Sequence, residues 1–360
     1  MLSKFVVEGI RDGSVAYILS VNKGFWLTMI RLLLAASLLA LSTLARAEPF
    51  DGLLRQAEQF GNLRTLIIAH QGEVVLQRAF NGSDLNQPAN IKSASKSLIS
   101  ALVGIAIEKD LIDHESDAIH RYLSGDFPAD PDPRLNNITV SHLLSMQAGL
   151  QRTSGQNYGG WVASRNWVQN ALARPFVTDP GGSMQYSTGS THLLSAILTS
   201  ESGRSTQQLA NDWLAPAGIR VNHWLLDPQG IPLGGNQVTM TPASLLALGE
   251  LYRRGGLGRN GEPVLSREWI DKSWTVRTHS RFTGDGYGYG WFIRPFNGYQ
   301  GYYGWGYGGQ MIYVIPELEL TIAITSDETL PAGRSGYRNE LHQLVARDIV
   351  PLIEQASSSQ

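Results

Sequence analysis

The segment "NIKSASKSLISALVGIAIEKD" (Asn90–Asp110) joins a polar start to a long aliphatic run. Its polar side chains and one glycine recur at spacings of three and four residues: Ser93, Lys96, Ser97, Ser100 and Gly104. Such spacing places them on one narrow stripe of a helix, while aliphatic residues cover the remaining faces. The segment therefore predicts a buried central helix. A lysine in it loses hydration without an evident structural gain.

Ser93 lies in the first turn of this helix, where backbone amides and the helix dipole favour a developing negative charge. Lys96 follows one turn later, so its amine can reach the Ser93 hydroxyl. Desolvation lowers a lysine pKa, and the neutral amine can then take a proton from a weakly nucleophilic serine. We expect Lys96 to activate Ser93. The same spacing also arises by chance from a capping serine and a solvated lysine.

The rest of the pattern predicts strands near both ends of the chain and helices between them. Thr241 is expected to cap a helix that has Pro242 in its first turn and stops at Gly255-Gly256. An antiparallel sheet flanked by helices, with an inserted helical part, follows from this order. The other expected elements are a β-hairpin at Arg64–Phe80, strands at Gly286–Arg294 and Gln310–Asp327, and a helix at Arg338–Gln355.

The stretch beginning at Met29 is typical of a secretory signal peptide. It has a basic residue at Arg31, an apolar run at 32–44 and the A-x-A pattern 45–47. We expect cleavage after Ala47 and export to the periplasm. A transmembrane anchor, the alternative, needs about 20 apolar residues.

The predicted boundaries follow from this signal. We expect Met29 to be the true start, with residues 1–28 an extension upstream of it, 29–47 the signal and 48–356 one domain. Its α/β part covers about 48–108 and 237–356, and its helical part about 109–236.

The composition restricts partners and cofactors. A net charge of -2 gives no indication of nucleic acid or anionic membrane as a partner. Cysteine is absent, which excludes disulfides and cysteine-based metal sites. The eight histidines show no metal-binding spacing, so we expect neither metal nor cofactor. The oligomeric state stays open.

Two further segments accompany the Ser93 segment. Tyr186-Ser187-Thr188 precedes an apolar helix, and Tyr307-Gly308-Gly309 enters a strand. With Ser93-Ala94-Ser95-Lys96, they resemble the three motifs of the serine β-lactamase and penicillin-binding-protein superfamily. The likeness is greatest to its class C β-lactamase-like branch, which includes esterases and 6-aminohexanoate-dimer hydrolases. It covers nearly all of the mature chain and implies an α+β fold of the β-lactamase/transpeptidase type.

The resemblance implies roles for these residues. Ser93 would be the acylated nucleophile, and Lys96 and Tyr186 would share proton transfer, with the Tyr186 pKa lowered by the ammonium. The backbone N–H groups of Ser93 and Gln310 would form the oxyanion hole. The substrate-binding residues would be Thr188, Tyr307, Gly308, Gly309, Tyr158, Trp305 and Arg334.

Two positions depart from the family's motifs. Thr188 replaces the usual Asn, and Tyr307 replaces the usual Lys or His, whose charge would bind a carboxylate. Arg334 is a candidate replacement for that charge, although a surface arginine is the plainer interpretation. Tyr158, Trp161 and Trp167 either line the cleft or pack within the helical part. We expect Trp305 to form a cleft wall and Trp291 to be core.

These observations predict an exported serine hydrolase that cleaves a small ester or amide through an acyl-enzyme. A β-lactamase or D-alanyl-D-alanine peptidase is the first alternative. A non-catalytic binding module on the same fold is the second. The sequence does not identify the natural substrate.

Overall fold

The computed structural model describes residues 50–329 and 336–358. Its main element is an eight-stranded antiparallel sheet with strand order β2-β1-β11-β10-β9-β8-β7-β6. The strands are β1 (Leu63–His70), β2 (Glu73–Ala79), β6 (Thr278–His279), β7 (Gly286–Tyr287), β8 (Phe292–Phe296), β9 (Tyr299–Gly306), β10 (Gln310–Ile315) and β11 (Leu320–Ser326).

The N-terminal hairpin pairs with the last C-terminal strand near one edge of this sheet, where β1 and β11 are the second and third strands. β1 pairs with β11 through registers such as Leu66 with Ile324. The β1–β2 turn has positive φ at both Gln71 and Gly72, the backbone that tight hairpin turns require. The expected hairpin at residues 64–80 and the antiparallel sheet are both confirmed.

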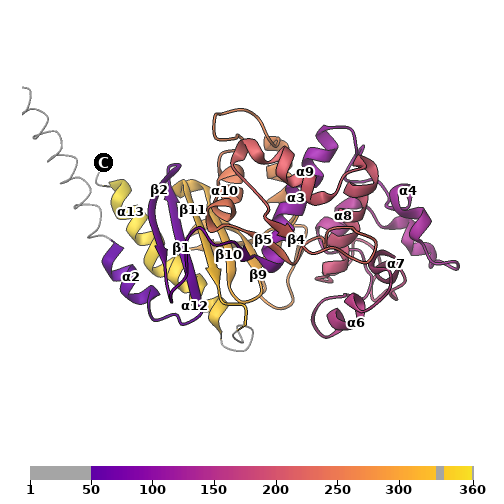
Figure 1. The fold of residues 1–360 in the computed structure, drawn as a ribbon, viewed down its shortest axis with the longest axis horizontal. Helices are drawn as coiled ribbons and strands as arrows, with labels where there is room; N and C mark the ends of the chain where they lie inside the picture. The colour runs from indigo at the N-terminus through magenta and orange to yellow at the C-terminus, as the bar shows by residue number, and fades with distance from the viewer. Residues whose placement is uncertain (1–49, 330–335, 359–360) are drawn as a thin grey trace, which may run out of the picture. The chain divides into compact units, whose positions relative to one another are not determined.

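Alternate residues of β10 face opposite helical layers, because side chains alternate along a strand. Ile312 and Val314 lie beside Gly249 of α10 (Pro242–Arg253). Between them, Tyr313 turns the other way and shares a hydrogen bond with His342 of α12 (Tyr337–Gln343). Helices therefore cover both faces of the sheet (Figure 1).

The expected C-terminal helix is helical throughout but not regular. A π-helical segment (Leu344–Ile349) separates α12 from α13 (Val350–Ser358). Pro351 has no N–H to give to the preceding turn, which accounts for the altered hydrogen bonding there.

The Ser93 segment forms a 3-10 turn (Lys92–Ala94) that continues into α3 (Ser95–Glu108). Residues Ser95 to Ala106 of α3 are buried, as the aliphatic pattern predicts. The helix lies between the sheet and the helical part of the chain (Figure 1). It thus holds the serine at the junction of the two parts.

The helical part comprises short helices around the longer α8. They are α4 (His120–Leu123), α5 (Val140–Leu144), α6 (Tyr158–Val162), α7 (Trp167–Leu172), α8 (Thr188–Ser202) and α9 (Thr206–Trp213). A small sheet of β3 (Ala89–Asn90), β5 (Val238–Met240) and β4 (His223–Trp224) joins it to the sheet-bearing part. The remaining helices are α2 (Asp51–Ala57), at the start of the described chain, and α11 (Arg267–Ser273). Within the described residues, no helix has both the length and the apolar character needed to cross a bilayer.

Candidate active site

Ser93 and Lys96 meet as their spacing predicts. The Lys96 Nζ lies 3.1 Å from the Ser93 hydroxyl and donates to the Gly235 carbonyl at 2.7 Å. Lys96 is only 1% exposed and has no carboxylate partner among the described residues. Burial lowers its pKa to about 7. A substantial fraction of this amine is therefore neutral near pH 7 and able to accept a proton.

Tyr186 completes the cluster by a hydrogen bond to Ser93. Its ring lies 5.0 Å from Lys96 Nζ and packs against Tyr287 and Phe292. Burial raises the pKa of the phenol, and the Ser93 hydrogen bond offsets this only in part. The expected lowering of this pKa is thus wrong, because burial dominates and the desolvated lysine is not a fixed positive charge.

The backbone before the nucleophile is held in an unusual conformation. Lys92 has φ of 49°, a left-handed value that costs a side-chain-bearing residue about 1–2 kcal/mol. Its amide donates to Asn90 Oδ1 at 3.1 Å, and its carbonyl accepts from Ser95 Oγ at 2.6 Å. Its Nζ contacts Glu328 Oε2 at 2.8 Å and Gln237 Oε1 at 3.0 Å. These contacts fix the turn that carries Ser93.

A cleft of about 550 Å³ opens beside Ser93 and Tyr186. Trp305 lines it as the expected cleft wall, and Tyr307, which is 52% exposed, lines it as well. The other lining residues are Arg152, Ser154, Gly155, Ser280, Phe282, Phe292, Gly336, Arg338 and Asn339. Most of these come from loops without a motif, so no pattern in the sequence indicates them.

Thr188 and Tyr158, which were expected to bind substrate, do not line the cleft. Thr188 is buried and contacts the Ser154 hydroxyl at 3.0 Å, so Ser154 occupies the cleft wall in front of it. Tyr158 packs edge-on against Trp161 and its hydroxyl accepts from Asn236 at 3.2 Å.

Three of the tryptophans are core residues. Trp161 and Trp167 form a buried cluster with Leu233, so packing is the correct alternative for them. Trp291 is also core, as predicted.

The three residues that follow Tyr307 are directed away from the cleft. A side chain at Gly308 would meet the backbone of Asp327 and Glu328, and one at Gly309 would meet the Tyr337 ring. Gln310 is buried, and its side chain exchanges two hydrogen bonds with the Ser326 backbone. These three residues turn the chain from β9 into β10 rather than lining the cleft. Arg334 lies outside the described residues.

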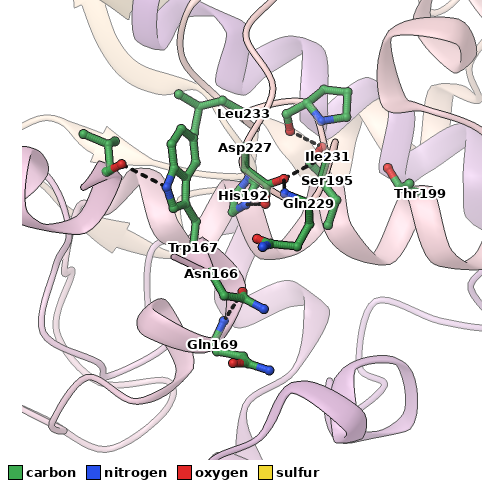
Figure 2. A network of polar contacts seen from close by, with 12 residues as sticks. Asn166, Trp167, Gln169, His192, Ser195, Thr199, Asp227, Gln229, Ile231 and Leu233 are labelled. Atoms are coloured by element: carbon green, nitrogen blue, oxygen red, sulfur yellow. Dashed lines mark hydrogen bonds and ion pairs between the residues drawn. The ribbon is translucent and has the colours of Figure 1, made fainter. Parts of the chain in front are cut away.

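A buried polar network joins α8 to the loop around Asp227 in the helical part (Figure 2). His192 of α8 contacts the Asp227 carboxylate at 3.1 Å, and neither side chain is exposed. The other Asp227 oxygen accepts from the amides of Gln229 and Ile231, each at 2.8 Å. Burial raises the pKa of Asp227, but these hydrogen bonds outweigh it and the pKa lies below its usual value. The pair anchors the loop that leads to Gly235.

The side chains near Ser93 are suited to covalent chemistry rather than to metal binding. Across residues 50–329 and 336–358, no group of three His, Asp or Glu side chains could hold a metal ion. A serine, an amine and a phenol in mutual contact can instead move one proton and form one covalent bond.

Comparisons with known proteins agree with this architecture. The sequence model of a family described as Beta-lactamase matches residues 64–347. The presumed 6-aminohexanoate-dimer hydrolase from Bacillus anthracis has a TM-score of 0.69 at 19% identity, over 85% of this chain and 82% of that one. EstCE1, a hydrolase with promiscuous acyltransferase activity, has a TM-score of 0.68 at 20% identity, over 85% and 100%. These structures establish the likeness of fold.

A curated relative matches a shorter region. A probable fimbrial assembly protein FimD, serogroup H1, of Dichelobacter nodosus is 32% identical over 133 residues. These residues are 36% of this chain and 33% of the relative, so the match covers about a third of each protein. It adds no assignment of activity.

Proposed function

Because this chain belongs to the beta-lactamase family, with the fold of its serine hydrolases, we propose that it cleaves a small ester or amide through an acyl-enzyme on Ser93. The observation that carries the proposal is the contact of the Ser93 hydroxyl with both the Lys96 amine and the Tyr186 phenol. A serine becomes a useful nucleophile when a base adjoins it.

The proposed first half-reaction uses the neutral form of Lys96. Its amine takes the Ser93 proton as Oγ bonds to the substrate carbonyl carbon, giving a tetrahedral intermediate. The bond to the leaving group then breaks, and Tyr186 supplies a proton to the departing atom while Lys96 returns its extra proton to Tyr186. Deacylation runs this relay in reverse. Water attacks the acyl carbon as Tyr186 takes its proton and passes its own proton to Lys96, and Lys96 then protonates the Ser93 oxygen as the bond from Ser93 to the acyl carbon breaks.

For the intermediate's oxyanion, we propose the amides of Ser93 and Tyr307 in place of Gln310. Ser93 is second in its 3-10 turn, where amides have no intrahelical acceptor. Tyr307 lines the cleft beside Ser93, and no acceptor for its amide is present among the described residues. Losing one such donor typically costs about 10²–10³ in rate.

An activated ester tests the proposal directly. The purified protein should release p-nitrophenol from p-nitrophenyl acetate, with a burst equal to the enzyme concentration if deacylation is slower. Ser93→Ala should abolish release, and intact-mass measurement should show one acetyl group on wild type only. Release that persists in Ser93→Ala would reject Ser93 as the nucleophile.

A fluorescent penicillin separates the first alternative from this proposal. Tyr307 stands where the resembled motif usually carries a cation, so we expect little labelling of Ser93 by the penicillin. Strong labelling, with slow turnover of p-nitrophenyl acetate, would favour a β-lactamase or D-alanyl-D-alanine peptidase. If a fluorophosphonate and a panel of esters and amides all left Ser93 unmodified, a binding module would be favoured.

The proposal includes export. Residues 29–47, which have the signal-peptide pattern, lie outside the described residues, so this part rests on sequence. Expression of the full reading frame in a Gram-negative host should give periplasmic protein whose N-terminus is Glu48. A cytoplasmic product that retains residues 29–47 would contradict it.

A further inference from the structure

A second hollow of about 390 Å³ adjoins the Ser93 cleft. The two share three lining residues, Arg152, Tyr186 and Phe282. The second hollow is otherwise lined by Gln151, Gln156, Asn157, Met184, Gln185 and Arg281. Because Tyr186 lines both hollows and its phenol contacts Ser93, the second hollow lies close to the nucleophile.

The second hollow is lined by positive charge. Arg152 and Arg281 contribute two guanidinium groups, and no Asp or Glu is among the described residues that line either hollow. Arg281 donates to the Ser183 hydroxyl at 3.2 Å, and Arg152 stacks 5.2 Å from the Phe282 ring centre. Neither has a carboxylate partner in the described part of the chain.

The nearest acidic residue in sequence is already engaged elsewhere. Asp285 lies in the same loop as Arg281, but it accepts from the Tyr303 hydroxyl at 2.6 Å and lies 3.8 Å from Arg294. The two arginines are therefore free to bind an anion from solution. Their planar donor sets match a carboxylate, and the four amide side chains of the hollow can complete its hydrogen bonding.

Tyr186 determines which half of a substrate enters this hollow. In the function proposed above, its phenol gives a proton to the departing atom, so the leaving group must lie on its side of the scissile bond. We propose that the second hollow holds the leaving group, and that Arg152 and Arg281 bind a carboxylate on it. The substrate class is then an ester or amide whose alcohol or amine half is an acid. This inference rests on the proposed function.

A matched pair of esters tests it. The substrates 4-acetoxybenzoate and 4-acetoxybenzamide differ only in a charged or neutral group on the leaving phenol. The measured quantity is the ratio of their kcat/KM values. We expect Arg152→Gln and Arg281→Gln each to lower the wild-type ratio about fivefold, the effect of a partly solvated charged hydrogen bond. Added salt should also lower the wild-type ratio.

Two further arginines serve as comparisons. Arg277 packs over Tyr289 at 4.7 Å and lines neither hollow, so Arg277→Gln should keep the wild-type ratio. Arg338 lines only the first hollow. If the kcat/KM ratio of the two esters fell in Arg338→Gln but kept its wild-type value in Arg281→Gln, the carboxylate would lie beside Ser93 and the proposal would be overturned. An unchanged ratio in both Arg152→Gln and Arg281→Gln would also overturn it.

A binding measurement separates this inference from the proposed function. With Ser93→Ala, which cannot be acylated, titration should give 4-acetoxybenzoate a Kd several-fold below that of 4-acetoxybenzamide. Arg281→Gln added to Ser93→Ala should remove the difference. Equal binding of the two compounds to Ser93→Ala would reject the carboxylate site. Failure of wild type to hydrolyse either ester, with selective binding intact, would reject only the hydrolase.

Discussion

The Gly235 carbonyl lies 2.7 Å from Lys96 Nζ, closer than the Ser93 hydroxyl at 3.1 Å. A neutral amine that donates to Gly235 has its lone pair free to face the Ser93 hydroxyl, so this carbonyl orients the amine that we propose as the base. Gly235 has φ of 75°, and a Cβ there would lie 2.8 Å from Lys96 Cγ and 2.3 Å from Thr191 Oγ1. Glycine is therefore required at this position for two reasons, backbone conformation and space.

Gly235→Ala should lower kcat by about 10²-fold, since small displacements of a catalytic group have effects of this size. Gly230→Ala in the same loop is the matched control. It has a similar φ of 85°, but nothing lies within 4 Å of its Cβ. Both variants strain the backbone. Only the part of the kcat loss that exceeds the loss in Gly230→Ala therefore reports on the position of Lys96. Equal losses of p-nitrophenyl acetate turnover in the two variants would contradict this role.

The rate of acylation should rise with pH through about 7. Only neutral Lys96 accepts the Ser93 proton, and burial lowers its pKa to about 7, so the protonated form accumulates below that pH. Burial raises the Tyr186 pKa, so the phenol stays protonated through the neutral range. The measurement is kcat/KM for p-nitrophenyl acetate between pH 5 and pH 9. A flat profile between pH 6 and pH 8 would contradict Lys96 as the base.

Lys96→Met should abolish acylation yet stabilise the fold at pH 7. Below the folded pKa of about 7, the protein must bury an ammonium that the unfolded chain keeps hydrated. Between that value and the unfolded pKa near 10.4, the unfolded state binds more protons, so wild-type stability rises with pH. Urea unfolding should show a gain of roughly 1–3 kcal/mol for Lys96→Met at pH 7, shrinking toward pH 10. A gain that does not change with pH would contradict the buried charge.

Lys92→Gly should separate stability from activity. Glycine accepts the left-handed backbone without strain, which offsets the lost contacts to Glu328 and Gln237, so the melting temperature should change little. The turn carrying Ser93 becomes freer, so kcat should fall about tenfold with KM nearly constant.

Asn297→Gly is the control for Lys92→Gly. Asn297 has the same φ of 49° in the β8–β9 turn, outside the cleft, so its replacement should leave kcat unchanged. An unchanged kcat in Lys92→Gly as well would show that its contacts serve the fold alone.

Local periodicity was sufficient for the buried central helix and for the contact between Ser93 and Lys96. Ser93 and Lys96 share a helical start, so a spacing of three residues brings their side chains together. The alternation of side chains and the turn residues predicted strands at both ends of the chain. The antiparallel pairing of β1 with β11 agrees with the predicted sheet. Tyr186 was found only through the resemblance of its motif.

The position of the third motif relative to Ser93 depends on the register in which β9 and β10 pair, and a motif does not encode strand register. The sequence placed Gln310 at the oxyanion hole, but the turn between β9 and β10 ends there, and Gln310 is the first residue of the buried strand. The oxyanion amide that we propose instead, that of Tyr307, lies three residues earlier in the chain. The pairing of β9 with β8 and β10 sets where the turn between β9 and β10 falls.

By itself, then, the sequence determined the buried helix, the serine with its lysine and the antiparallel sheet, because each depends on residues a few positions apart. Only the tertiary structure decided which loops meet that serine. Gly235 contacts Lys96 across 139 positions of sequence, and Arg281 and Arg152 meet in one hollow through the packing of separate segments. Such contacts follow from chain closure and packing, which no local pattern records.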